Sequence, residues 1–416
     1  MREVKSYVEQ IDLWQINNFQ SIISSVESES GIASNLFSVL IQSCEFDKLK
    51  ITELQICTMN IKTLVWVVIL TIQCPLLITC FGPVSGLVAG FAGLGSIIYT
   101  GFQGLRCKIF VCCDKSQISL NIVGLRQNLS QYLHGQHLVE KAVIGHIKGH
   151  LQSVDPPKAL VLSFHGLTGV GKNFVSRLIA DNIYKDGLHS PFVHLISATK
   201  EFPHEGMVPF YKDTLKKWIE GNVTKCERSM FIFDEVDKLP SLLLDVIKPY
   251  LDHYLQLGGV SYRKAIFIFL SNAGGTEIGR LALEHKQSGK KREDLHLSDI
   301  EGSVMVSAIN ADNHNGLWHS QLISNHLITS FIPFLPLEKE HVRSCIRDDI
   351  VKKYPWHFYD QHVVPEDYVD EVLQELKFYP PAEQFFSVTG CKRVSEKVDY
   401  VMIDKNIRTS IGRKEL

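Results

Sequence analysis

The stretch "HGLTGVGKNF", residues 165–174, constrains the fold of this chain more than any other. Two glycines separated by four residues and followed by lysine, from Gly166 to Lys172, have the spacing of a phosphate-binding loop. The preceding run "ALVLSFHG" is typical of a buried strand, and "NFVSRLIADNIYK" after it has apolar residues at helical spacing. A strand, a glycine turn and a helix in this order predict an α/β domain that binds phosphate at a helix N-terminus.

The loop predicts most of the contacts to a nucleotide. Its glycines let backbone N–H groups approach the phosphates, and its lysine reaches the β- and γ-phosphates. The predicted nucleotide-binding residues are Gly166, Leu167, Thr168, Gly169, Val170, Gly171, Lys172 and Asn173.

Asn173 stands where the phosphate-loop pattern has Ser or Thr. An asparagine carbonyl is also a hard oxygen ligand for Mg²⁺, but its side chain is longer and magnesium demands tight octahedral geometry. From the loop alone a working site, an impaired site and a chance match all stay open. We expect nucleotide binding to survive and catalysis to be weak alone or dependent on help.

Two further apolar strands end in polar residues that suit the same site. "SMFIFDEVDK" (229–238) places Asp234 to hold Mg²⁺ and Glu235 to deprotonate the attacking water. "AIFIFLSNAGG" (265–275) places Asn272 to hold that water or the γ-phosphate. Each strand alone is an ordinary core strand with a polar end, but the three together predict ATP and Mg²⁺ at the carboxyl edge of a parallel sheet.

The N-terminal third carries no charge from Thr63 to Leu105, which is ample for a membrane-inserted segment of about 20 residues. Residues 59–82 have the form of a signal peptide or signal anchor. Residues 83–106 are rich in small residues and predict a membrane-associating segment, although a buried Gly/Ala core helix is the alternative. Residues 1–58 either arise from gene modelling, with Met59 as the true start, or form the cytosolic tail of an uncleaved anchor.

Three further features bear on compartment and partners. Two N-x-S/T sequons, at Asn128 and Asn222, are weak signals alone, but together with a signal sequence they favour glycosylation and a lumenal body. The net charge of -2 gives no sign of a nucleic-acid partner. Ten cysteines without C-x-x-C pairs argue against a zinc site.

The stretches "GLTGVGKNFVSRLIADNIY", "FIFDEVDK" and "FIFLSNAGG" resemble the torsins, which are AAA+ ATPases related to the Clp unfoldases. Asparagine after the loop lysine is itself a torsin mark, and the resemblance runs from about Gly82 to the C-terminus. It implies an ATPase of the endoplasmic reticulum and nuclear-envelope lumen that acts in chaperone-type protein or membrane remodelling, at a membrane surface and in ring-like homo- or hetero-oligomers.

The resemblance also implies residues that spacing alone does not find. "LHGQHLVEKA" is similar to a box that packs near adenine, here Gly135 and Gln136. "TGCKRV" resembles a sensor-2 element, whose Lys392 approaches the γ-phosphate from a lid domain. Cys345 and Cys391 resemble a torsin pair that can form a disulfide.

No arginine occurs from Leu317 to Leu337, where Clp-like proteins carry the finger that completes a neighbour's site. Asn325 and His326 occupy the corresponding place. Torsins share this gap and take the arginine from the lumenal domain of a type II membrane protein. The resemblance therefore implies an ATPase that depends on a partner, since such a finger contributes about 10³–10⁵ in rate.

The expected architecture is an AAA+ α/β domain over residues 107–337, with a parallel five-stranded sheet, and a small helical lid over 338–416 that contains no buried strand. A nucleotide-gated binding module with negligible turnover is the alternative function, although the retained Glu235 opposes it. A cytosolic Clp-like unfoldase is a third reading, opposed by the signal, the sequons and the missing arginine.

Overall fold

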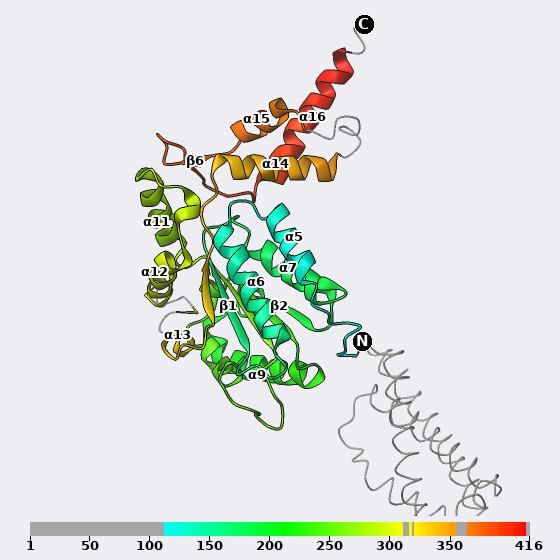
Figure 1. Cartoon of the computed structure of the whole chain (residues 1–416), viewed down its shortest axis with the longest axis vertical. Helices are drawn as coiled ribbons and strands as arrows, with labels where there is room; N and C mark the ends of the chain where they lie inside the picture. The colour runs from blue at the N-terminus through cyan, green and yellow to red at the C-terminus, as the bar shows by residue number, and fades with distance from the viewer. Residues whose placement is uncertain (1–111, 311–315, 318–319, 355–363, 413–416) are drawn as a thin grey trace, which may run out of the picture. The chain divides into compact units, whose positions relative to one another are not determined.

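The computed structural model describes residues 112–310, 316–317, 320–354 and 364–412 (Figure 1). The predicted segments 1–58, 59–82 and 83–106 lie outside the described residues. Among the helices that are described, none combines the length and apolar character needed to cross a bilayer.

A five-stranded, wholly parallel sheet lies at the centre of the body, which confirms the predicted sheet. Its order is β2-β3-β4-β1-β5, so the first strand pairs with both the fourth and the fifth. The loops that follow β1 and β4 are therefore neighbours at the carboxyl edge of the sheet. The strands are β1 (Leu160–His165), β2 (Val193–Ser197), β3 (Met230–Asp234), β4 (Ile266–Ser271) and β5 (Ser330–Pro333).

Successive strand residues alternate between two buried faces, because side chains of a strand point to opposite sides of the sheet. On one face Phe231 and Phe267 stack with ring centroids 5.0 Å apart, while Ile232 and Ile268 belong to the core of the other face. Burial on both faces explains why these strands read as continuous apolar runs.

Helices cover each face of the sheet. One face packs against α5 (Ile122–Tyr132), α6 (His137–Gln152) and α7 (Lys172–Ile183), the cyan to green helices of Figure 1. The other face packs against α9 (Val208–Lys225), α11 (Gly275–Gln287) and α12 (Leu297–Ile309). Short elements connect them: η3 (Gly187–His189), α8 (Ala198–Glu201), η4 (Glu205–Met207), η5 (Val236–Lys238), η6 (Leu244–Ile247), α10 (Lys248–Leu251), η7 (Arg292–Asp294) and α13 (Gln321–Ser324).

After β5 the chain leads into a helical lid formed by α14 (Lys339–Lys353), α15 (Glu366–Gln374) and α16 (Val394–Gly412). These helices enclose a small aliphatic core of their own, which includes Val342, Ile346, Val372 and Val398.

The expectation that no buried strand follows Glu338 is wrong. β6 (Phe378–Tyr379) and β7 (Phe386–Ser387) pair antiparallel, and the side chain of Phe386 is buried against the core of the sheet body. Strands of two residues are too short to show any hydrophobic period, so the sequence pattern contains no signal for them.

Candidate nucleotide site

The phosphate loop joins β1 to α7 and has the backbone that the glycine spacing predicts. Gly169 and Gly171 have φ of 77° and 108°, in the left-handed region that favours glycine. A Cβ on Gly169 would lie 1.9 Å from the carbonyl oxygen of Thr389, at the start of the sensor-2 segment. Glycine at this position therefore allows the loop and the lid to meet backbone to backbone.

Lys172 is the first residue of α7, and its ammonium group is turned onto its own loop. Nζ donates to the carbonyl oxygens of Gly166 at 2.7 Å and Leu167 at 2.9 Å, and to Oδ1 of Asn272 at 3.0 Å. Burial lowers the pKa of Lys172 to about 8, although the carboxylates of Asp237 and Asp234 favour the charged form. The loop thus holds a desolvated cation beside the end of β4, a site suited to an anion.

Asp234 and Glu235 end β3 and face the same edge of the sheet. Asn173 donates its side-chain amide to Oδ2 of Asp234 at 2.7 Å, which joins the unusual loop residue to the proposed Mg²⁺ ligand. Oδ1 of Asp234 accepts the backbone N–H of Glu235 at 2.9 Å. Glu235 has φ of 56°, a left-handed conformation that is uncommon for residues other than glycine.

Two residues that sequence reasoning missed hold these groups in place. Thr199, in α8 after β2, donates its hydroxyl to Oε2 of Glu235 at 2.9 Å. Asp237 accepts the backbone N–H of Asn272 at 2.8 Å and so fixes the end of β4. Asp237 lies in the stretch "DEVDK" that contains Asp234 and Glu235, whereas no local signal marks Thr199.

The sensor-2 segment contacts the phosphate loop directly. The backbone N–H of Cys391 donates to the carbonyl oxygen of Gly169 at 3.0 Å. Lys392 is exposed, and its charge is one of the influences that lower the pKa of Lys172. A Cβ on Gly169 would lie 3.0 Å from the Cβ of Lys392, so the backbone of the lid lysine lies beside the phosphate loop.

Gln136, at the start of α6, is 2% exposed and uses its side-chain amide on backbone groups. Nε2 donates to the carbonyl oxygens of Val170 at 3.1 Å and Leu335 at 2.8 Å, and Oε1 accepts the N–H of Leu335 at 2.9 Å. Gly135, with φ of 69°, packs against the ring of His341. Gln136 therefore clamps the phosphate loop to the chain that leaves β5.

The other predicted residues are the pair before the lid, the sequon asparagines and the cysteines. Asn325 and His326 are exposed at the end of α13, and the sequon residues Asn128 and Asn222 are partly exposed on α5 and α9. Cys345 of α14 and Cys391 form a disulfide. A second disulfide, Cys113–Cys226, joins the start of the described chain to the end of α9 and was not predicted, because its cysteines are 113 residues apart.

The donor set fits Mg²⁺ held partly by phosphate. Within the described ranges no group of three or more His, Cys, Asp and Glu side chains could enclose a metal ion. One carboxylate, Asp234, with the amide of Asn173 beside it, suits a cation that keeps several waters and takes oxygen ligands from a nucleotide.

Two family models match the chain. The torsin family model matches residues 107–233, and the model for the Torsin-1A C-terminal domain matches residues 337–401. In solved structures, the chain is similar to Hsp104 of S. cerevisiae bound to ADP, with a TM-score of 0.48 and 16% identity, over 70% of this chain and 48% of that one.

A torsin-like protein of Caenorhabditis elegans is 45% identical over 298 residues, which is 72% of this chain and 82% of the relative. At this identity and coverage, with both family models matched, the chain belongs to the torsin family of AAA+ ATPases.

Proposed function

We propose that this chain is a partner-activated ATP hydrolase of the endoplasmic reticulum and nuclear-envelope lumen, weak alone, that works in chaperone-type protein or membrane remodelling. The observation that carries the proposal is the group of side chains at the carboxyl edge of the sheet, in which Lys172 bonds Asn272 and its neighbour Asn173 bonds Asp234, the residue before Glu235. It contains a phosphate-binding cation, a metal ligand and a general base, the parts that phosphoryl transfer to water needs.

Each side chain has a role in this proposal. Lys172 and Lys392 neutralise the terminal phosphates from the loop and from the lid. Asp234 and Asn173 hold Mg²⁺, which when bound offsets charge on the phosphate oxygens. Glu235 accepts the proton of the attacking water, and Thr199 and Asn272 orient the groups around that water.

Dependence on a partner is supported by the cations present at the site. Within the described residues, the cations at the cluster are Lys172 and Lys392, and no arginine follows α12 before the lid. An arginine finger in trans supplies charge that develops in the transition state. We propose that the lumenal domain of a type II membrane protein donates it, at a membrane surface and within a ring-like assembly.

A lumenal location is supported by the disulfides Cys113–Cys226 and Cys345–Cys391, because such bonds persist mainly in oxidising compartments. The sequon at Asn128 lies on α5 and is partly exposed. Sensitivity of the native protein to an endoglycosidase tests this location, and an unmodified protein with free thiols contradicts it.

The deciding experiment is an ATPase assay of the full chain with and without the lumenal domain of the candidate partner. We expect low basal turnover and stimulation of about 10³-fold or more when an arginine is donated. A partner domain with that arginine changed to alanine is the control, and it should bind without stimulating.

A nucleotide-gated binding module is the second candidate, and the Asn173–Asp234 bond favours it because this amide competes with a metal ion for Asp234. The same assay separates the two. If no partner domain raises ATP turnover, yet partner binding depends on the nucleotide, the binding module is favoured.

A further inference from the structure

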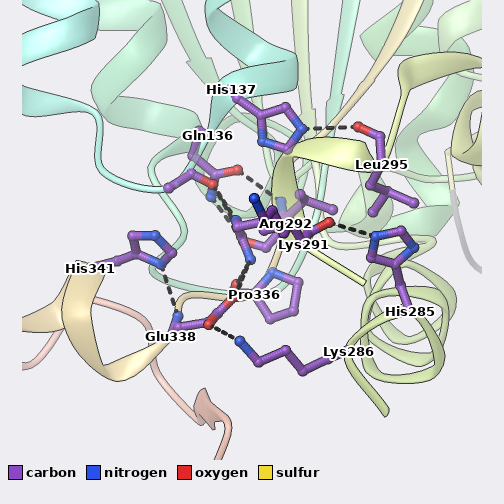
Figure 2. A network of polar contacts seen from close by, with 12 residues as sticks. Gln136, His137, His285, Lys286, Lys291, Arg292, Leu295, Pro336, Glu338 and His341 are labelled. Atoms are coloured by element: carbon purple, nitrogen blue, oxygen red, sulfur yellow. Dashed lines mark hydrogen bonds and ion pairs between the residues drawn. The ribbon is translucent and has the colours of Figure 1, made fainter. Parts of the chain in front are cut away.

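Arg292 is a buried cation that the nucleotide cluster does not use. It begins η7, between α11 and α12, and its side chain is 8% exposed. Nε and Nη2 donate to the carbonyl oxygen of Gly135 at 2.9 and 2.6 Å, and Nη1 donates to that of Pro336 at 2.9 Å (Figure 2). Burial lowers the pKa of Arg292 to about 10, so the guanidinium stays charged near neutral pH.

The acceptors of Arg292 identify its position in the fold. Pro336 and Glu338 belong to the connection between β5 and α14, through which the sheet body leads into the lid. Nη1 of Arg292 lies 3.6 Å from Oε1 of Glu338, and Oε2 of Glu338 pairs with Lys286 at 2.6 Å. Gln136 holds the same connection at Leu335. We call residues 335–338 the hinge.

Helix α11 contacts both the phosphate loop and the hinge. It begins at Gly275, three residues after Asn272, where a Cβ would lie 3.0 Å from the backbone of Gly166 and Leu167. Near its other end Lys286 pairs with Glu338. Because α11 is a rigid helix, a shift at the end beside Asn272 and the phosphate loop also moves the end that contacts the hinge.

The segment that follows α11 is fixed by hydrogen bonds to α11 and to α6. His285 in the last turn of α11 hydrogen-bonds through Nε2 to the carbonyl oxygen of Lys291 at 2.7 Å. His137 of α6 hydrogen-bonds through Nε2 to the carbonyl oxygen of Leu295 at 2.9 Å (Figure 2). The backbone is thus held at Lys291 and Leu295, on either side of Arg292. A displacement of α11 therefore also moves the Arg292 guanidinium.

We propose that Arg292 is a positioning residue that couples the γ-phosphate end of the nucleotide site to the orientation of the lid, through its bonds to the hinge. The inference rests on the proposed function, because it requires ATP at the cluster of Lys172 and Asn272. With Arg292 in place, α11 and the hinge move together, and Lys392 is presented to the γ-phosphate. Without it the lid still folds, but its position no longer depends on that phosphate.

The coupling predicts a specific loss in Arg292→Gln. Affinity for ATP should fall toward the affinity for ADP, and the ATP-to-ADP affinity ratio should drop about tenfold, within the 5–150-fold range typical of coupled sites. Arg280→Gln is the matched control, because Arg280 lies on α11 and pairs at the surface with Glu277 and Glu284, away from the hinge. The control should keep the wild-type ratio.

Two further variants separate coupling from general stability. Arg292→Lys keeps a charge near Glu338 but loses the fork of donors, and we expect it to restore part of the ratio. Glu338→Gln changes the hinge residue that faces Arg292 and Lys286, but keeps side-chain hydrogen bonding. It should lower the ATP-to-ADP affinity ratio less than Arg292→Gln does. If Arg292→Gln does not fold, Glu338→Gln decides, and a wild-type ratio in it overturns the proposal.

The direct measurement is a distance distribution between labels on the body and the lid. Val154 and Tyr400 are 86% and 63% exposed and accept labels through unnatural amino acids, so the disulfides stay intact. ATP should narrow the distribution relative to ADP in wild type but not in Arg292→Gln. Wild-type discrimination that persists in Arg292→Gln overturns this inference alone. Failure of the wild type to bind ATP overturns the proposed function as well.

Discussion

The sheet body and the lid are held together by different forces. The body has two extensive cores, one on each face of the sheet, in which the aromatic and aliphatic residues of β3 and β4 are almost wholly buried. The lid has one small core and relies on partly exposed ion pairs, such as Lys353 with Asp349 and Asp399, and on the Cys345–Cys391 disulfide.

The difference assigns different tasks to the two regions. Glu235 and Lys172 belong to the part fixed mainly by burial, which changes little with salt, although the Cys113–Cys226 disulfide also stabilises it. Lys392 belongs to the part fixed by charge and by a disulfide that includes its neighbour Cys391, so salt and redox conditions can alter its position. We infer that chemistry is built into the body, whereas its timing is set through the lid.

The largest effect is expected from removing the proposed general base of the body. Glu235→Gln keeps the shape of the side chain and removes the general base, so partner-stimulated turnover should fall about 10²–10⁴-fold. Binding of ATP should be retained, because Lys172 and Asp234 are untouched. Stimulated ATPase rates and nucleotide affinity, measured on the same preparation, check both statements, and unchanged turnover would exclude Glu235 as the base.

The next effect is a pH dependence that belongs to the body. Lys172 is protonated below its pKa of about 8 and loses its charge as pH rises, so ATP binding should weaken about tenfold between about pH 7 and about pH 9. Lys172→Ala should bind ATP weakly at every pH, since a charge-assisted contact is absent. Titration of ATP affinity against pH in both proteins tests the assignment, which a flat wild-type profile contradicts.

The body was predictable because its signals are local. The loop from Gly166 to Lys172, and the pairs of acidic or amide residues that end two apolar runs, each appear within a few residues of sequence. Parallel strands bring such ends to one edge, which explains why Lys172, Asp234 and Asn272 meet. Asp237 lay within the same stretch but has no distinguishing spacing.

The contacts between distant segments were not predictable. Arg292 reads as one more basic residue in "GKKRED", and only the folded chain shows its side chain beside Gly135, 157 residues earlier. The Cys113–Cys226 disulfide and the two-residue strand β7 are of the same kind. A single sequence carries no period or motif for contacts that the packing of remote elements creates.

A smaller effect is expected from the lid disulfide. Cys391 donates its backbone N–H to Gly169 and precedes Lys392, so opening its bond to Cys345 should shift how the lid meets the loop. We expect a several-fold change in partner affinity with ATP on reduction, without unfolding, because the lid helices keep an apolar core of their own beside the disulfide. Partner binding before and after reduction, in wild type and Cys391→Ser, measures it.

Cys226→Ser is the matched control, since it removes the body disulfide and leaves the lid bond. It should lower the free energy of unfolding by about 2–4 kcal/mol and leave partner affinity near the wild-type value. Equal partner binding by oxidised wild type, reduced wild type and Cys391→Ser would show that the lid pair only packs, and the contrast between body and lid would then not extend to redox conditions.

The smallest effect, on basal turnover, is expected from giving the phosphate loop its usual residue at position 173. Asn173→Thr replaces the amide that bonds Asp234 with the compact hydroxyl of the usual phosphate loop, and so improves the geometry for Mg²⁺. Basal turnover should nevertheless stay within about twofold of wild type, because the transition state still lacks the cation that we propose a partner donates, which contributes about 10³–10⁵. The basal ATPase rate of Asn173→Thr, beside the rate of each protein with partner added, measures the two defects separately. Fast basal hydrolysis in this variant would place the whole defect in the body at Asn173, and the lid and partner would lose the role in timing that we assign to them.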